Sequence, residues 1–345
     1  MTTPPDFAAR LIAWQKRHGR HDLPWQQSRD AYRVWLSEIM LQQTQVSAVI
    51  PYYQRFLARF PDLASLAAAQ LDAILENWAG LGYYARARNL HRCARQVMEE
   101  HGGVFPQDPE KLQSLAGIGR STAAAIAVFS AGRRAAILDG NVKRVLCRHA
   151  GIEDFPGSAM TEKRLWTLAE SLLPNSGVEA YTQGLMDLGA TLCSRSRPRC
   201  GDCPLSTDCQ ARLANRQDEL PAPRPRKPLP ERATTFVLIC DGSAVLLQRR
   251  PPQGIWGGLL APPEGEPETV VGQLGLTTCA PEPLPDLTHT FTHFRLHIAP
   301  VLCHIDCRPT LVQETGWRWQ ALSELDQAAL PTPVRKLLKT LVQKD

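Results

Sequence analysis

The sequence predicts two domains, an all-α domain followed by a smaller α+β domain. Apolar residues recur at helical spacing in residues 1–213, and the pattern changes to alternating apolar and polar residues after residue 232. Residues 214–232 hold five prolines and charges of both signs, which is typical of an extended linker. We therefore expect a helical domain over 1–213, a linker over 214–232 and a second domain over 233–345.

The helical pattern divides at glycine, proline and polar breaks. The segment AYRVWLSEIMLQQTQV is apolar on nearly all sides, so it predicts one buried helix over 31–46. The other helices of the first domain are expected over 7–18, 47–59, 63–69, 71–78, 84–101, 109–115, 141–149, 161–173 and 178–190, with one more beginning near residue 120.

The second domain begins with ATTFVLICDG and SAVLLQRR, which predict a β-hairpin turning at Asp241-Gly242. The segment HTFTHFRLHIAPVLCHI alternates over its whole length and predicts one long strand. A final helix is expected over 333–343.

Composition narrows the cellular setting and the binding partner. The 345 residues are 43% hydrophobic and carry a net charge of +5, with the basic excess in residues 1–232. A basic first part suits binding to a polyanion such as nucleic acid. No apolar run reaches ~18 residues and the first residues lack a signal-peptide pattern, so we expect a cytoplasmic protein, nucleoid-associated in a bacterium.

Residues 112–150 carry two motifs that suggest chemistry. In LAGIGRSTAAAI, Gly117 and Gly119 let the backbone turn tightly, and the helix that begins beside Ser121 offers free N–H groups to an anion such as a nucleic-acid phosphodiester. The alternative is an ordinary turn between two helices. In ILDGNVKRV, Asp139 lies where a helix begins. It could present an acid to a ligand there, or it could serve only as the N-cap of that helix.

Two further positions suggest a reaction on nucleic acid. Glu38 lies beside Leu36 and Ile39 in an apolar helix, where loss of hydration would raise the pKa of its carboxyl towards that of a general acid. The alternative is a solvated stripe shared with Gln42 and Gln45. Tyr83 lies on a glycine-flanked loop before several arginines, which suits stacking on a base or, alternatively, burial in the core.

Four cysteines within 17 residues predict a metal site in a reducing compartment: Cys193, Cys200, Cys203 and Cys209. Structural zinc usually takes its ligands from two short pairs, whereas this single C-x2-C pair with long gaps favours a [4Fe–4S] cluster. The other six are expected to be core thiols: Cys93, Cys147, Cys240, Cys279, Cys303 and Cys307.

These motifs together resemble one family. LAGIGRSTAAAI and ILDGNVKRV are similar to the helix-hairpin-helix and catalytic-aspartate segment of the endonuclease III superfamily of DNA glycosylases, and the cysteine spacing resembles the [4Fe–4S] loop of that superfamily. SEIMLQQTQV, with a Glu that endonuclease III does not have there, and GLGYYARARNL resemble the MutY family of adenine DNA glycosylases. IWGGLLAPPEG and HTFTHF resemble the Nudix-like recognition domain of that family, so the resemblance covers nearly the whole chain.

The resemblance implies a fold and a reaction. The fold would be multidomain, an all-α helix-hairpin-helix glycosylase domain with a [4Fe–4S] loop and a C-terminal α+β Nudix-like domain. The protein would be a monomer that binds double-stranded DNA, flips out adenine mispaired with 8-oxoguanine or guanine, and hydrolyses the N-glycosidic bond of that adenine.

The resemblance also implies roles for individual residues. Glu38 would protonate adenine at N7, Asp139 would stabilise the oxocarbenium-like sugar or attack it, and Asn141 would hold Asp139 and the water in place. Gln43 and Tyr83 would enter the base stack. Further DNA contacts would come from Gly117, Gly119 and Ser121, and contacts to the opposite base from Phe291, Thr292 and His293.

Three features depart from known patterns. Ser121 stands where bifunctional relatives have a Schiff-base lysine, so little or no lyase activity is expected. Thr292 stands where the family more often has Ser, which keeps a hydroxyl and alters the fit to 8-oxoguanine. The acidic stretch after Gly258 lacks the Nudix glutamate pattern, and Gly265 and Pro267 should interrupt a helix there, so the module is expected to bind rather than catalyse.

Two other functions compete with this interpretation. One is an endonuclease III-like pyrimidine glycosylase with lyase activity, against which Ser121, Glu38 and the extra domain argue. The other is a DNA-binding protein without chemistry, against which the matched positions of Glu38 and Asp139 argue.

Overall fold

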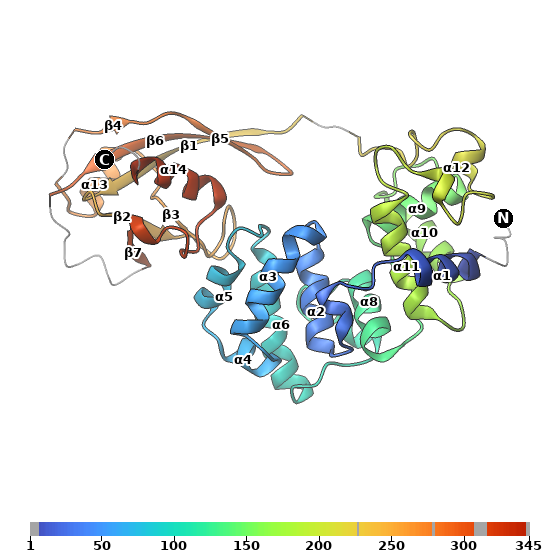
Figure 1. Cartoon of the computed structure of the whole chain (residues 1–345). Coiled ribbons are helices and arrows are strands. Elements are labelled where there is room, and N and C mark those ends of the chain that lie inside the picture. Colours follow the sequence, from blue (N-terminus) through green and yellow to red (C-terminus); the bar gives the residue numbers. More distant parts are fainter. Residues whose placement is uncertain (1–6, 226–227, 278–279, 307–315, 343–345) are drawn as a thin grey trace. The chain divides into compact units, whose positions relative to one another are not determined.

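The computed structural model describes residues 7–225, 228–277, 280–306 and 316–342, and the chain divides into two compact units (Figure 1). The first unit comprises Met1–Ala68 and Asn89–Arg226, and the second comprises Ala69–Arg88 and Lys227–Asp345. Cys279 and Cys307, which were predicted to be core thiols, lie outside the described residues. None of the described helices has the length and apolar character needed to span a bilayer.

The first unit is helical, as the residue spacing predicts. Its helices are α1 (Phe7–His18), η1 (Pro24–Gln27), α2 (Ala31–Leu41), α3 (Val46–Arg59), α4 (Leu63–Ala68), α7 (Pro109–Gln113), α8 (Arg120–Ala131), α9 (Gly140–Ala150), α10 (Ala159–Ser171), α11 (Val178–Thr191), η2 (Cys200–Asp202) and α12 (Gln210–Leu213). Helix α5 (Leu71–Trp78) belongs to the second unit, and α6 (Ala85–His101) begins in the second unit and ends in the first.

Small side chains in α8 bring two helices of the first unit close together. Residues Ala123–Val128 of α8 are all buried, and four of these six are alanine. Short side chains allow backbones to approach, and α2 packs against α8. The helix that carries Glu38 therefore lies beside the helix that follows the glycine hairpin.

One predicted helix ends earlier than expected. The expected helix over 31–46 ends at Leu41, and α3 begins at Val46, because Gln43 adopts a left-handed backbone with φ of 55°. The N–H of Thr44 donates to the carbonyl of Leu41 at 3.2 Å and closes a turn there. Residues 42–45 are polar and at least partly exposed, so no apolar face holds them in a helix.

The second unit is built on one mixed sheet, described here without residues 278–279 and 307–315. Strand order is β3-β2-β1-β6-β4, with β5 also paired to β6 and β7 to β2. Strands β1 and β6 are parallel and the other pairs are antiparallel. The bounds are β1 (Glu231–Cys240), β2 (Ala244–Arg249), β3 (Leu260–Ala261), β4 (Glu282–Pro283), β5 (Leu287–Thr290), β6 (Arg295–His304), β7 (Trp317–Ala321), α13 (Pro267–Gln273), η4 (Leu322–Glu324) and α14 (Thr332–Val342).

Both faces of this sheet are buried. Alternation in β1 sends Phe236 and Leu238 into a core that includes Val334 of α14, while Val237 and Ile239 enter a second core with Val270 of α13. One helix therefore covers each face (Figure 1). Helix α13 begins at Pro267, in agreement with the expected interruption of the acidic stretch. Four other cysteines predicted to be core thiols are buried: Cys93, Cys147, Cys240 and Cys303.

The hairpin at Asp241-Gly242 is confirmed, whereas the single long strand over 289–305 is wrong. That segment folds into the antiparallel pair β5 and β6 around Thr292-His293. The N–H of Phe291 donates to the carbonyl of Phe294 at 2.9 Å, and the two rings stack at 4.5 Å. Phe291 and Phe294 both contact the core although they are three residues apart, so the alternation changes phase at the turn.

The two glycines of the hairpin before α8 are under different constraints. Gly117 has φ of 77°, and a Cβ there would lie 2.7 Å from the Cβ of Asn89. Gly119 has an ordinary φ of −86°, and a Cβ there would meet no atom within 4 Å. The fold therefore requires glycine at 117 and leaves the backbone at 119 open to a ligand.

We expect Gly117→Ala to lower the free energy of unfolding by about 1–3 kcal/mol, because it adds both a clash and a strained backbone. Gly119→Ala is the matched control and should change the free energy by no more than about 0.5 kcal/mol. Urea unfolding followed by circular dichroism measures both. Equal destabilisation by the two variants would contradict this assignment of the hairpin.

Candidate active site

Helix α2 brings a carboxyl group into a desolvated setting. Asp30 caps the helix, accepting from the N–H of Arg33 at 2.9 Å, and the neighbours Ser37 and Ile39 of Glu38 are buried. Glu38 itself is half-buried, and burial first and the nearby Asp139 carboxyl second raise its pKa to about 8. Glu38 is therefore not on a freely solvated stripe and can carry a proton at neutral pH.

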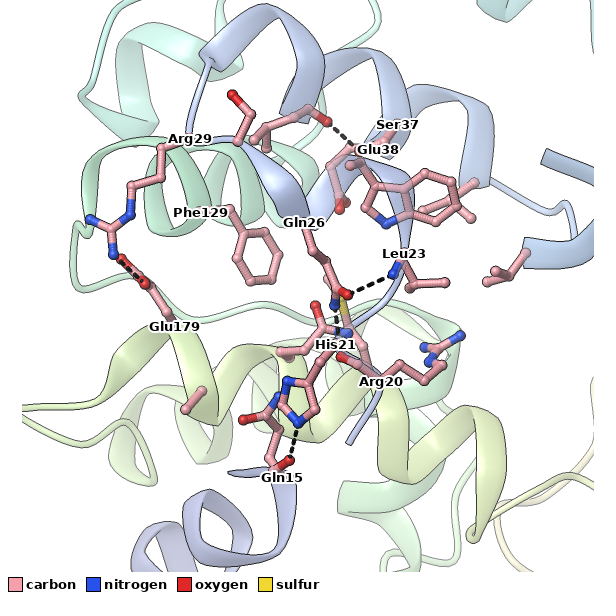
Figure 2. Close-up of a pocket in the computed structure, with 18 residues that line it drawn as sticks. Gln15, Arg20, His21, Leu23, Gln26, Arg29, Ser37, Glu38, Phe129 and Glu179 are labelled. Atoms are coloured by element: carbon pink, nitrogen blue, oxygen red, sulfur yellow. Dashed lines mark hydrogen bonds and ion pairs between the residues drawn. The ribbon is translucent and has the colours of Figure 1, made fainter. Parts of the chain in front are cut away.

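Glu38 lies on the wall of a cavity of about 360 Å³ (Figure 2). Apolar and polar side chains from α1, η1, α2, α8 and α11 surround it, among them Trp25, Phe129 and Gln183. A cavity of this size, mainly enclosed by side chains from several helices, suits a small planar ligand such as a purine base.

A groove of about 1030 Å³ lies next to the cavity, and both are lined by Arg20, Glu38, Leu41, Val46 and Met186. The groove is also lined by four further residues that the sequence places in catalysis or DNA binding. These are Gln43, Ser121, Asp139 and Asn141. Glu38 thus stands where the cavity opens onto the groove.

Asp139 is the N-cap of α9, as its place in the sequence suggests, and it also faces the groove. Its Oδ1 accepts from the N–H of Val142 at 2.7 Å. Burial raises the pKa of Asp139, while the N–H groups of Val142 and Asn141 and the charges of Arg144 and Lys143 oppose that rise. Asp139 therefore both caps α9 and presents its carboxyl to the groove.

The two carboxyls lie in unequal surroundings. Burial and the Asp139 carboxyl raise the pKa of Glu38 to about 8. Burial also raises the pKa of Asp139, but two N–H groups and two cations oppose that rise. Glu38 is therefore suited to carry a proton, and Asp139 is the carboxyl whose ionised form receives support, which are the two roles that cleavage of a glycosidic bond needs.

Arg144 fixes the start of α9 to the rest of the first unit. Its guanidinium donates to the Oδ1 of Asn141 at 2.8 Å, to the carbonyl of Gly189 at 2.6 Å and to the carbonyl of Cys193 at 2.8 Å. A Cβ at Gly189 would lie 2.7 Å from the Cβ of Asn141, so α11 and α9 touch there. Asn141 contributes its backbone N–H to Asp139, and its side chain is held by Arg144.

Ser121 does more than line the groove. Its Oγ accepts from the N–H of Leu138 at 2.9 Å, which ties the beginning of α8 to the residue before Asp139. Gly117 and Gly119 lie in the turn that leads into α8, as expected.

Four residues predicted to contact DNA belong to the second unit. Tyr83 is 48% exposed with φ of 49°, and the guanidinium of Arg86 lies 5.4 Å from its ring centroid. Thr292 and His293 are exposed at the tip of the β5–β6 hairpin, and Phe291 beneath them is half-buried. An exposed aromatic ring and a hairpin tip are both available to a ligand.

The four clustered cysteines line one small cavity together with Arg148. Their thiols are free, and the guanidinium of Arg148 donates to the Sγ of Cys193 at 3.4 Å. Within the described residues, no three His, Cys, Asp or Glu side chains are arranged to hold a single metal ion. The structure therefore brings the four cysteines to one cavity without arranging their thiols around a single point.

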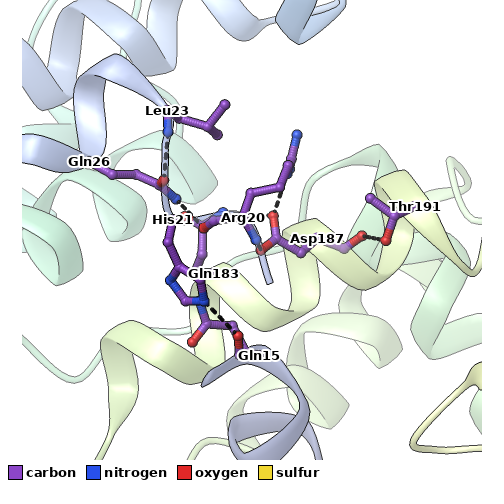
Figure 3. A network of polar contacts seen from close by, with 8 residues as sticks. All are labelled: Gln15, Arg20, His21, Leu23, Gln26, Gln183, Asp187 and Thr191. Atoms are coloured by element: carbon purple, nitrogen blue, oxygen red, sulfur yellow. Dashed lines mark hydrogen bonds and ion pairs between the residues drawn. The ribbon is translucent and has the colours of Figure 1, made fainter. Parts of the chain in front are cut away.

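Several cavity residues are absent from the sequence-based site. These are Arg20, His21, Gln26 and Gln183, from η1, the segment before it, and α11. Asp187 of α11 does not line the cavity but binds the guanidinium of Arg20 (Figure 3). The one signal in the sequence is Asp187, a lone acid in the apolar run GLMDLGA.

Comparison with known proteins agrees with this geometry. Residues 36–171 match the family model described as HhH-GPD superfamily base excision DNA repair protein, and residues 234–340 match a NUDIX domain model. A solved thermostable thymine-DNA glycosylase is 29% identical with a TM-score of 0.56, covering 60% of this chain and 95% of that one. An endonuclease III–DNA complex at 19% identity and a TM-score of 0.53, covering 62% of this chain and 99% of that one, shares the fold. The fold and site therefore define a helix-hairpin-helix base-excision DNA repair protein with an appended Nudix-like domain.

Full-length relatives define the family more closely. The chain is 36% identical to the adenine DNA glycosylase of Buchnera aphidicola subsp. Acyrthosiphon pisum (strain APS), covering 96% of this chain and 97% of the relative. It is 33% identical to the human adenine DNA glycosylase, covering 96% of this chain and 73% of the relative. The chain belongs to the adenine DNA glycosylase family, whose members hydrolyse N-glycosidic bonds in base-excision repair.

The raised pKa of Glu38 makes the stability of Glu38→Gln depend on pH. Folding favours the protonated carboxyl, so the wild-type protein loses free energy of unfolding as pH rises from the ordinary carboxyl range towards about 8. Glutamine mimics the protonated form and avoids this loss. We expect the variant to match the wild type near about pH 4 and to exceed its stability by about 1–3 kcal/mol near about pH 9. Urea unfolding across this range measures the difference, and a difference independent of pH would refute the assignment.

Proposed function

We propose that this adenine DNA glycosylase removes adenine opposite 8-oxoguanine or guanine by acid catalysis and has little or no lyase activity. The observation that carries the proposal is the position of Glu38 between a base-sized cavity and the groove that contains Asp139. Adenine would enter the cavity, and its sugar and backbone would lie in the groove.

Glu38 would donate its proton to adenine N7, which makes the base a neutral leaving group. Asp139, whose ionised form is favoured by two N–H groups and two cations, would stabilise the positive charge that develops on the sugar. Asn141 would keep the N-terminal turn of α9 in place through its bond to Arg144. Water would then complete the hydrolysis.

The absence of lyase chemistry rests on Ser121. A hydroxyl that already accepts from the N–H of Leu138 cannot form a Schiff base with the abasic sugar. Gly117 and Gly119 would bind the phosphodiester through the N-terminus of α8, with Gln43 and Tyr83 entering the base stack. The hairpin tip with Phe291, Thr292 and His293 would contact the base opposite adenine. The protein would bind duplex DNA as a monomer.

Single-turnover base release tests the reaction. Wild-type protein should release adenine from a duplex with adenine opposite 8-oxoguanine at least about a hundredfold faster than from one with adenine opposite thymine. Strand breaks should follow only after alkali. Glu38→Gln should slow release by about a hundredfold or more while DNA binding stays within about threefold. Breaks without alkali, or release unaffected by this substitution, would overturn the proposal.

The four cysteines are proposed to hold a [4Fe–4S] cluster with a structural role. The free thiols, the common cavity and the guanidinium of Arg148 beside Cys193 support this assignment, because a cationic donor favours thiolate ligands. When bound, the cluster would tie the loop after α11 together and take no part in breaking the glycosidic bond.

Metal analysis tests the cluster. Purified wild-type protein should contain about four iron atoms per chain with visible absorbance, and Cys203→Ser should lose most of both. Cys303→Ala, at a buried thiol of β6, is the matched control and should keep its iron. About one zinc per chain in place of iron would contradict the proposal.

A further inference from the structure

The loop that carries Tyr83 is built into the second unit, although it lies within the helical part of the sequence. Tyr83 has a left-handed backbone, and its carbonyl accepts from the N–H of Arg86 at 2.8 Å where α6 begins. The guanidinium of Arg86 donates to the carbonyls of Leu81 and Gly82 at 3.3 Å and 3.2 Å. These contacts place the exposed ring of Tyr83 on a loop whose backbone is held in one conformation.

Two hydrogen bonds join this loop and the start of α6 to other parts of the second unit. The hydroxyl of Tyr84 donates to the carbonyl of Leu330 at 3.3 Å, just before α14. The guanidinium of Arg88 donates to the backbone carbonyl of Gly257. Burial lowers the pKa of Arg88, so this guanidinium is partly removed from water and its bond to the carbonyl is worth more than an exposed one.

The carbonyl that binds Arg88 belongs to a short segment that also supports the β5–β6 hairpin. Next to Gly257, Trp256 has φ of 52°, a left-handed backbone that costs a non-glycine residue roughly 1–3 kcal/mol. The centroid of its ring lies 5.6 Å from that of Phe291. A Cβ at Gly257 would lie 2.3 Å from the carbonyl oxygen of Pro252, so the backbone is tightly packed there. One strained segment therefore contacts both α6 and the ring beneath the hairpin tip.

We propose that Arg88 and Trp256 are positioning residues for mispair specificity, which hold Tyr83 and the β5–β6 hairpin tip in one arrangement on the DNA. The inference rests on the proposed function, in which Tyr83 enters the base stack and the tip contacts the base opposite adenine. Two binding elements that are joined act at an effective concentration far above that of two independent ones. A fitting opposite base therefore favours insertion of Tyr83, and a base that does not fit gives no such help.

A guanidinium near DNA could instead bind a phosphate. That role would strengthen binding to every duplex alike, because phosphate contacts carry no sequence information. The geometry favours the positioning role, since Arg88 is half-buried and already donates to the carbonyl of Gly257. The two roles differ in whether loss of Arg88 changes the response to the opposite base.

Single-turnover rates test the proposal on two duplexes that differ only in the base opposite adenine, 8-oxoguanine or thymine. The ratio of the two rates is the measure, because it cancels any loss of folded protein. Arg88→Met keeps much of the apolar stem and removes the donor, and it should lower the ratio by about three- to tenfold, the equivalent of one hydrogen bond. Arg88→Lys can still donate to the carbonyl of Gly257 and should retain most of the ratio. Arg95→Met, at an exposed arginine of the same helix paired with Glu99, is the matched control and should leave the ratio unchanged.

A double-mutant cycle tests whether Arg88 acts through Tyr83. Tyr83→Ala removes the ring and should lower the ratio by itself. Addition of Arg88→Met to Tyr83→Ala should lower the ratio by less than about twofold more, because the loop no longer carries the ring that Arg88 positions. Trp256→Leu, which removes the ring beside Phe291, should lower the ratio in the wild-type background as Arg88→Met does.

Three results would overturn the inference. Equal slowing of both duplexes by Arg88→Met would reduce Arg88 to a support of the fold or a phosphate contact. Full additivity of Arg88→Met with Tyr83→Ala would show that Arg88 does not act through that ring, and an unchanged ratio in Trp256→Leu would remove Trp256 from the bridge. A wild-type protein that does not distinguish 8-oxoguanine from thymine is a different result, since it overturns the proposed function itself.

Discussion

The site depends on the cost of placing two carboxyl groups beside one desolvated groove. Burial raises the pKa of both carboxyls, and the Asp139 carboxyl raises the pKa of Glu38 further. The surroundings of the two carboxyls differ. Helix α9 gives Asp139 two backbone N–H groups and two nearby cations, whereas α2 gives Glu38 apolar neighbours.

The arrangement of helices follows from this requirement. Alanines in α8 let α2 come close, which sets Glu38 near the segment that leads to Asp139. Ser121 binds that segment at Leu138, and Arg144 binds the next turn to α11 and to the carbonyl of Cys193. The cysteine loop therefore stands one hydrogen bond from the helix that carries the anion. A disturbance of that loop would reach the start of α9 through the guanidinium of Arg144.

Local sequence was sufficient for most helices and for the two carboxyls. Apolar spacing and a terminal glycine predicted α1, and Asp139 lies in a motif that is contiguous in the chain. The boundary between α2 and α3 was predicted after residue 46, whereas α2 ends at Leu41, because polar residues 42–45 can belong to a helix end as well as to a turn. The β5–β6 turn was missed because apolar residues stand close on both sides of it, Phe291 before and Phe294 after. The partnership of Asp187 with Arg20 joins residues far apart in the sequence, and no local pattern reports such a pair.

Ser121 shows how one hydrogen bond restricts the residue that a position can accept. Its hydroxyl is the acceptor for the N–H of Leu138, and a lysine ammonium has only donors to offer at that position. Introducing a lysine amine there would therefore leave a partly buried N–H unpaired one residue before Asp139. A lysine at this position would thus require a compensating acceptor near Leu138, so the two neighbouring segments would have to change together.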